Sequence, residues 1–204
     1  NTALGTAALY YNTTGGNNTA IGNTSLFNNT TGYNNTAVGY QAGYSNTTGS
    51  YTTMLGYQAG YSNLADQNVF VGYRAGYVNT TGAANVTVGG GGTFSANTTG
   101  GANTAVGYEA MLSNTVANNN SAFGTAALRN NTTGEYNIAV GTSALRLSTT
   151  GAGNSALGYA ALYSNTTGSN NTAVGYAAGY SNQTGTQNVF VGLFAGYSNT
   201  DSNN

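Results

Sequence analysis

The stretch that decides the fold is Asn35-Thr-Ala-Val-Gly-Tyr-Gln-Ala-Gly-Tyr-Ser-Asn-Thr-Thr-Gly-Ser-Tyr51, because close copies of it fill the chain. Each copy carries a glycine that follows an aliphatic or aromatic residue. These glycines are Gly5, Gly22, Gly39, Gly56, Gly72, Gly89, Gly107, Gly124, Gly141, Gly158, Gly175 and Gly192. They lie 17 residues apart, except for 16 between Gly56 and Gly72 and 18 between Gly89 and Gly107. A fixed period of this length indicates a repeat architecture, so we expect residues 1–204 to form one array, a segment of a longer fibre.

The composition excludes several classes of protein. Asn, Thr and Gly number 32, 33 and 32 of the 204 residues, charged residues make up only 3%, and His, Cys, Lys, Pro and Trp are absent. General acid–base catalysis and metal binding therefore lack their usual side chains, and we expect no enzyme, metal site or cofactor. Three arginines cannot neutralise a run of phosphates, and no apolar run approaches the roughly 20 residues of a membrane span. We expect no nucleic-acid partner and no membrane insertion by this segment.

The repeat is too short for a helix, a strand and two turns, and it is rich in the strand formers Thr, Val and Tyr. Hairpins are disfavoured because the chain lacks Asn-Gly and Asp-Gly, the dipeptides that two-residue hairpin turns prefer. A parallel stack of coils needs no such turns, and the absence of proline preserves every backbone donor. The sequence therefore predicts an all-β fold, a parallel β-solenoid (β-roll or β-helix) of about twelve 17-residue coils stacked about 4.8 Å apart.

Aligned copies of the repeat form columns along such a stack. We expect the residue before each repeated glycine to be core, because it is always large and apolar. These residues are Leu4, Ile21, Val38, Leu55, Val71, Val88, Val106, Phe123, Val140, Leu157, Val174 and Val191. The residue three after the glycine is always small, which indicates a narrow interior. The next column holds Leu in some coils and Gly in others, and Phe70 and Phe190 occur in Gly-type coils, which suggests that volumes compensate.

Two columns of asparagine flank each strand region and are expected to form hydrogen-bonded ladders between coils. The second column opens the Asn-Thr-Thr-Gly turns, which we expect to project outward because they are polar and absorb the changes in repeat length. Many of these asparagines begin Asn-x-Thr sequons. If the chain is N-glycosylated, the expected sites are Asn12, Asn46, Asn79, Asn97, Asn131, Asn165 and Asn182.

An aromatic column lies five residues after the repeated glycine. Its aromatic members are Tyr10, Phe27, Tyr44, Tyr61, Tyr77, Phe94, Tyr163, Tyr180 and Tyr197. Arg129 and Arg146 interrupt the column, and an arginine cannot lie unpaired inside so narrow a coil. We therefore expect the column on the surface, as an interface between subunits or as a site where tyrosine faces bind sugars.

The strand motif Asn-Thr-Ala-Val-Gly, at residues 35–39 and 171–175, resembles the repeats of YadA-like trimeric autotransporter adhesin heads, and the Asn/Thr/Gly-rich repeats also resemble phage tail-fibre shafts. In the adhesin family each chain forms a parallel β-roll and three rolls associate into an extracellular adhesive head. The resemblance covers nearly the whole chain, although the repeat of 17 residues is longer than the family's. It implies an extracellular, cell-surface or virion location.

Together these features predict a non-enzymatic extracellular fibre or adhesin shaft that associates with copies of itself, as a trimer or as an end-to-end filament. The alternative is a carbohydrate-binding or glycan-coated module whose partners are host or environmental glycans. Ice binding by the threonine column at residues 2, 19, 36, 53, 104 and 172 is a further alternative, which Val69, Ile138 and Val189 weaken by interrupting that column.

Overall fold

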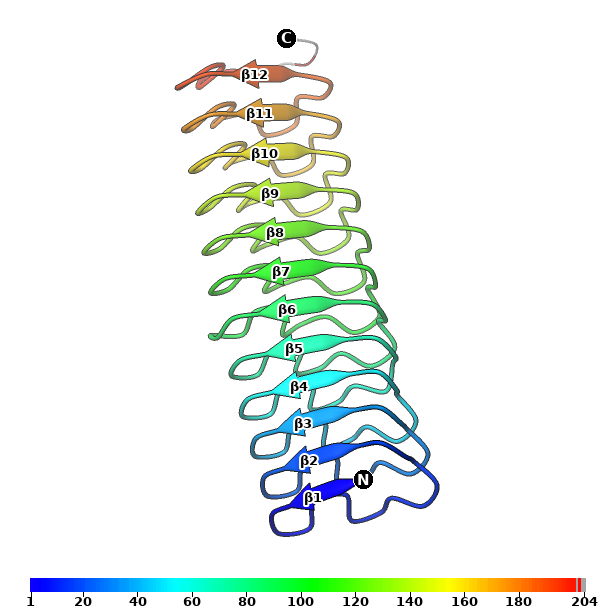
Figure 1. Cartoon of the computed structure of the whole chain (residues 1–204). Coiled ribbons are helices and arrows are strands. Elements are labelled where there is room, and N and C mark those ends of the chain that lie inside the picture. Colours follow the sequence, from blue (N-terminus) through cyan, green and yellow to red (C-terminus); the bar gives the residue numbers. More distant parts are fainter. Residues whose placement is uncertain (201, 203–204) are drawn as a thin grey trace.

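Each repeat contributes one three-residue strand to a tall stack of coils (Figure 1). The structure is a computed structural model, in which residues 1–200 and 202 are described. Over those residues the strands are β1 (Thr2–Leu4), β2 (Thr19–Ile21), β3 (Thr36–Val38), β4 (Thr53–Leu55), β5 (Val69–Val71), β6 (Val86–Val88), β7 (Thr104–Val106), β8 (Ser121–Phe123), β9 (Ile138–Val140), β10 (Ser155–Leu157), β11 (Thr172–Val174) and β12 (Val189–Val191). No described helix is long and apolar enough to cross a membrane.

The strands form one parallel sheet in chain order, with each strand bonded to the next. The register places equivalent residues opposite each other, as in Ala20 beside Ala37. Backbone hydrogen bonds also join successive coils outside the strands; for example, the Leu26 amide donates to the Ala42 carbonyl at 2.9 Å. The predicted all-β parallel β-solenoid, with about eleven turns and a repeat of roughly 17 residues, is confirmed.

The strand core differs from the prediction. The middle residue of each strand from β2 to β12 faces inward and is buried, and most of these residues are alanine. The residue before the repeated glycine faces outward instead; Leu157 is 50% exposed and Phe123 42%. Side chains alternate between faces along a strand, so a buried middle residue forces its two neighbours outward. The expectation of a buried aliphatic column was therefore wrong; the inward position holds alanine in most coils, and Met54, Phe70, Thr87 or Phe190 in the others.

The Leu and Gly alternation compensates volume, as predicted. In the coil of β9 the strand carries Ala139, and the buried Leu145 belongs to the same core. Where the strand carries Phe70, the neighbouring positions are Gly60 and Gly76, and a Cβ at either would collide with the phenyl ring. Two kinds of coil thus fill one cross-section with different residues.

Both asparagine columns run inside the coil as ladders. In one, the Asn18 side-chain oxygen accepts the Asn35 amide at 2.9 Å, while Asn18 Nδ2 donates to the Gly32 carbonyl at 2.8 Å. In the other, Asn114 Nδ2 donates to Asn97 Oδ1 at 2.9 Å. These bonds satisfy backbone groups that the turns leave unpaired and that would be costly to bury alone.

The expectation that the Asn-Thr-Thr-Gly asparagines project outward was wrong. Asn46, Asn79, Asn97, Asn131, Asn165 and Asn182 are completely buried, and Asn12 in the first coil is half-buried. In each of these turns the Nδ2 atom donates to the carbonyl three residues later, as Asn131 does to Gly134 at 2.9 Å. A sugar on Nδ2 would displace this bond, so the folded coil does not offer the seven predicted asparagines as acceptors.

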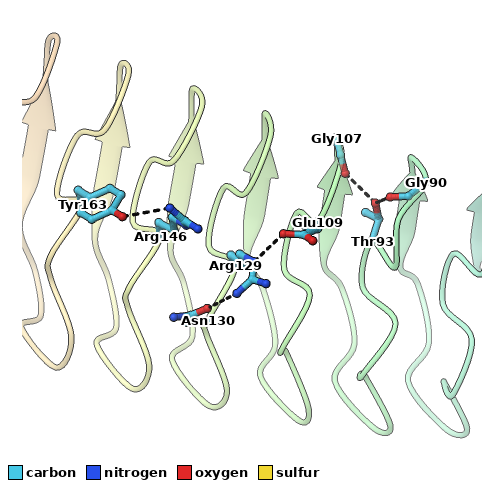
Figure 2. A network of polar contacts seen from close by, with 8 residues as sticks. All are labelled: Gly90, Thr93, Gly107, Glu109, Arg129, Asn130, Arg146 and Tyr163. Atoms are coloured by element: carbon cyan, nitrogen blue, oxygen red, sulfur yellow. Dashed lines mark hydrogen bonds and ion pairs between the residues drawn. The ribbon is translucent and has the colours of Figure 1, made fainter.

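The 18-residue repeat places its extra residue in the run from Gly89 to Gly92. Thr93 Oγ1 donates to the Gly90 carbonyl at 3.0 Å and approaches the Gly107 carbonyl at 2.7 Å (Figure 2). The insertion shifts Phe94 into the core column of Gly76 and Met111, where its side chain is completely buried. Phe94 therefore does not belong to the surface aromatic column in which the spacing had placed it.

Candidate interaction surfaces

The outward face of the sheet is the first candidate surface. Its two columns are the first and third residues of each strand, and no described strand contains a charged residue. The third position carries Leu, Ile, Val or Phe in every strand. We call this row of outward side chains, which includes Phe123, Val140 and Leu157, the aliphatic face. The strands that carry it follow one another along the whole stack (Figure 1), and a continuous apolar surface of this kind is a candidate interaction site.

The predicted aromatic column is the second surface, and the structure places it outside the coil as expected. Tyr44 and Tyr61 are half-buried, and their rings stack with centroids 5.1 Å apart and an angle of 4° between planes. The structure brings the eight predicted aromatics together in two stacks, the first formed by Tyr10, Phe27, Tyr44, Tyr61 and Tyr77 and the second by Tyr163, Tyr180 and Tyr197.

Stacking changes what these rings offer to a ligand. Neighbouring rings lie face to face at 5.0–5.4 Å, so the faces of inner rings such as Tyr44 and Tyr180 cover one another. Sugar binding by aromatic side chains needs an open ring face, and these stacks present ring edges and hydroxyl groups along their length. The geometry therefore does not favour the sugar-platform alternative.

Burial and crowding alter the acidity of the inner tyrosines. Desolvation, followed by the neighbouring phenols Tyr44 and Tyr77, raises the pKa of Tyr61 above its ordinary value. The pKa of Tyr180 is raised in the same way, by desolvation first and then by Tyr163 and Tyr197. Both phenols are therefore neutral at physiological pH, which keeps the stacks free of like-charge repulsion.

A second aromatic column lies one residue after the repeated glycine, beside the first. Its rings also stack, with Tyr40 to Tyr57 at 5.2 Å, Tyr57 to Tyr73 at 5.4 Å and Tyr159 to Tyr176 at 4.9 Å. The structure resolves this column as a wall parallel to the predicted stacks.

Arginines lie against the tyrosine stacks. The Arg74 guanidinium is over both Tyr73 and Tyr77, at 5.5 and 4.9 Å from the ring centroids. The Arg146 guanidinium is 5.8 Å from the Tyr163 centroid, and its Nη1 donates to the Tyr163 hydroxyl at 3.0 Å (Figure 2). Both arginines therefore make cation–π contacts with tyrosine rings.

Charged groups form one ion pair within the described residues, between Arg129 Nε and Glu109 Oε2 at 2.7 Å (Figure 2). Arg129 and Arg146 are both partly exposed, as expected for a column on the surface, and each has a partner. No group of three or more His, Cys, Asp or Glu residues lies together in the described part of the chain.

No family model, curated protein sequence or solved structure matches this chain. What the structure shows is a β-solenoid with asparagine ladders.

The aliphatic face is the surface that sequence reasoning missed. A signal for it was present, because the middle column of the strand is mostly alanine while the column after it is always large. In a three-residue strand only one of two adjacent columns can face inward, and in most strands the inward residue is the smaller one, an alanine.

Proposed function

We propose that this chain is a structural segment of an extracellular fibre or adhesin shaft, without enzymatic activity, which associates laterally with copies of itself. The observation that carries the proposal is the aliphatic face. Twelve strands place an outward Leu, Ile, Val or Phe in one row along the rod, with no charge on the described strands to disturb it. A second copy presents the same uncharged row and so fits it without burying an unpaired charge.

The rod itself supports a spacer role. Each coil hydrogen-bonds to its neighbours through backbone and asparagine ladders, and a rod built from such nearest-neighbour contacts suits a spacer. The resemblance to adhesin and tail-fibre repeats points to the same extracellular setting.

The size of the face sets the expected strength of association. Three residues at about 3.3 Å each and twelve strands about 4.8 Å apart give a strip of about 570 Å². A standard interface buries about 800 Å² per partner. Contact through this strip alone should therefore be weak for a rod of this length and should tighten as the number of coils grows.

Sedimentation equilibrium over a range of concentrations tests the proposal. Replacing Phe123 and Leu157 by Thr keeps the strand propensity while removing outward apolar area from β8 and β10. We expect the parent chain to associate. The double variant should associate more weakly, so that it stays monomeric up to a higher protein concentration than the parent.

The matched control is Val116→Thr, which removes an exposed valine from an Asn-Thr-Val turn, away from the strands. Its association should equal that of the parent. A parent chain that remains monomeric at every concentration, or a Phe123→Thr, Leu157→Thr variant that associates as strongly as the parent, would refute self-association through this face.

A further inference from the structure

An open hollow of about 380 Å³ lies among the turns that precede β6, β7, β8 and β9. Its lining comes mainly from two columns, the residues two and one before the asparagine that precedes each strand. In the coils of β6 and β7 both columns carry only small residues, which are Ala83, Ala84, Gly101 and Ala102. In the coil of β9 they carry Glu135 and Tyr136. The hollow therefore exists because two successive coils lack the larger side chains of their neighbours.

A carboxylate is held in position at one side of this hollow. Asn118 Nδ2 donates to Glu135 Oε1 at 2.7 Å, and Asn118 Oδ1 accepts the Gly101 amide at 2.8 Å. The ion pair found in the described part of the chain uses Glu109 and Arg129, so no arginine there neutralises Glu135. Its Oε2 atom has no hydrogen-bond partner among the described residues. The hollow thus contains a fixed, charged acceptor with one oxygen still available.

An uncovered aromatic ring lies beside this carboxylate. Tyr136 lines the hollow and is 63% exposed, and its ring contacts no other aromatic ring within the described residues. The tyrosines of the two stacked columns differ, because rings such as Tyr44 and Tyr61 cover one another. Tyr136 therefore offers the open ring surface that sugar binding needs and that the stacks do not provide.

We propose that this hollow binds a neutral saccharide, with a sugar ring against Tyr136 and a sugar hydroxyl donating to Glu135 Oε2. The exposed Thr99 and Asn119 side chains and the phenol can each donate and accept hydrogen bonds, as sugar hydroxyls do. A cation would use the acceptors and leave these donors unpaired, and an acidic sugar would be repelled by Glu135. The volume lies within the range of small-molecule sites, about 300–1,000 Å³. Because the hollow lies in the turns and not on the aliphatic face, the inference does not depend on self-association.

The test is an NMR titration of the full chain with the methyl glycosides of glucose, galactose, mannose and N-acetylglucosamine. We expect at least one of them to shift the ring signals of Tyr136, with saturation on the order of millimolar sugar. N-acetyl-lysine methylamide serves as the cationic probe and should bind more weakly than the best sugar. Absence of shifts at Tyr136 with all four glycosides, or equal or tighter binding of the cationic probe, would overturn the proposal.

The internal repeat supplies matched variants, whose binding is followed by the amide signals of the hollow. Tyr136→Ala should abolish binding, whereas Tyr51→Ala, in the same column with φ 58° against 59° and outside the hollow, should leave it unchanged. Ala102→Gln should fill the hollow and block the sugar; the backbone accepts it, because Gln67 in this column has φ 61° against 56°. Glu135→Gln keeps the shape without the charge and should weaken binding about tenfold. Binding that survives Tyr136→Ala or Ala102→Gln in a folded variant, or that falls equally in Tyr51→Ala, would contradict the assignment.

Discussion

Phe70 and Gly76 offer a direct test of how the two coil types fill one interior. Phe70 is completely buried in β5, and a Cβ at Gly76 would collide with its ring. Phe70→Ala should leave a cavity and cost about 3–5 kcal/mol. Gly76→Leu should overpack the same space and cost about 1–3 kcal/mol. Together the two changes recreate the pairing of Ala139 with Leu145, so the double variant should be more stable than Phe70→Ala alone, with a coupling energy of about 2–3 kcal/mol.

The backbone permits this exchange, since φ is 61° at Gly76 and 50° at Leu145. Repeat arrays need not unfold in one step, so the assay is native-state hydrogen exchange. The amide of Gly72, which donates to the Leu55 carbonyl at 2.8 Å, reports on the altered coil. The amide of Gly158, bonded to Val140 at 2.8 Å, is the distant control. If the effects of the two substitutions on the free energy of unfolding are additive, Phe70 and residue 76 do not compete for the same space, and the reasoning is refuted.

Two further predictions concern the asparagine ladder and the tyrosine stacks. Asn114→Ala removes a completely buried amide that donates to Asn97, and it should lower the free energy of unfolding by about 1–3 kcal/mol, measured by thermal or chemical unfolding. Asn23→Ala, at an exposed site, is the control and should change that free energy little. Equal effects of the two substitutions would argue against a stabilising role of the ladder. The pKa values of Tyr61 and Tyr180 are raised in the folded chain, so the stability they contribute is present below the unfolded pKa of about 10 and is lost as pH rises through the folded pKa. Circular dichroism and absorbance at alkaline pH should show unfolding that follows phenol ionisation, and Tyr61→Phe with Tyr180→Phe should move it to higher pH.

Much of the architecture follows from the sequence alone. The 17-residue period, the strand-forming residues, the lack of Asn-Gly and Asp-Gly and the lack of proline favour a stack of short parallel strands over hairpins. The asparagine ladders and the compensation of Phe70 by glycine were also readable, since each depends on the same position recurring in every coil.

The direction of the side chains depended on tertiary structure. Period alone cannot decide which of two adjacent columns faces inward, and a shift of one residue exchanges the core for the surface. In the closed coil the middle residue of the strand faces inward whatever its size, as Ala105 and Phe70 both do, while Val106 and Val71 face outward. The same closure draws the turn asparagines inward, because their amides are the donors nearest to carbonyls that water cannot reach.

The grooves between the tyrosine columns were likewise invisible in the sequence. The columns are separated by three residues along the chain, and the left-handed backbone at the positions between them, such as Ala160 with φ 52° and Leu162 with φ 51°, sets how they lie in space. The sequence by itself determined that tyrosines recur at one-coil spacing and therefore stack. Only the folded coil decided that two such stacks lie side by side, with Gln58 between them in one half of the rod and Ala177 in the other. The distance between the two stacks depends on the path of the backbone within one coil, which the repeat period does not specify.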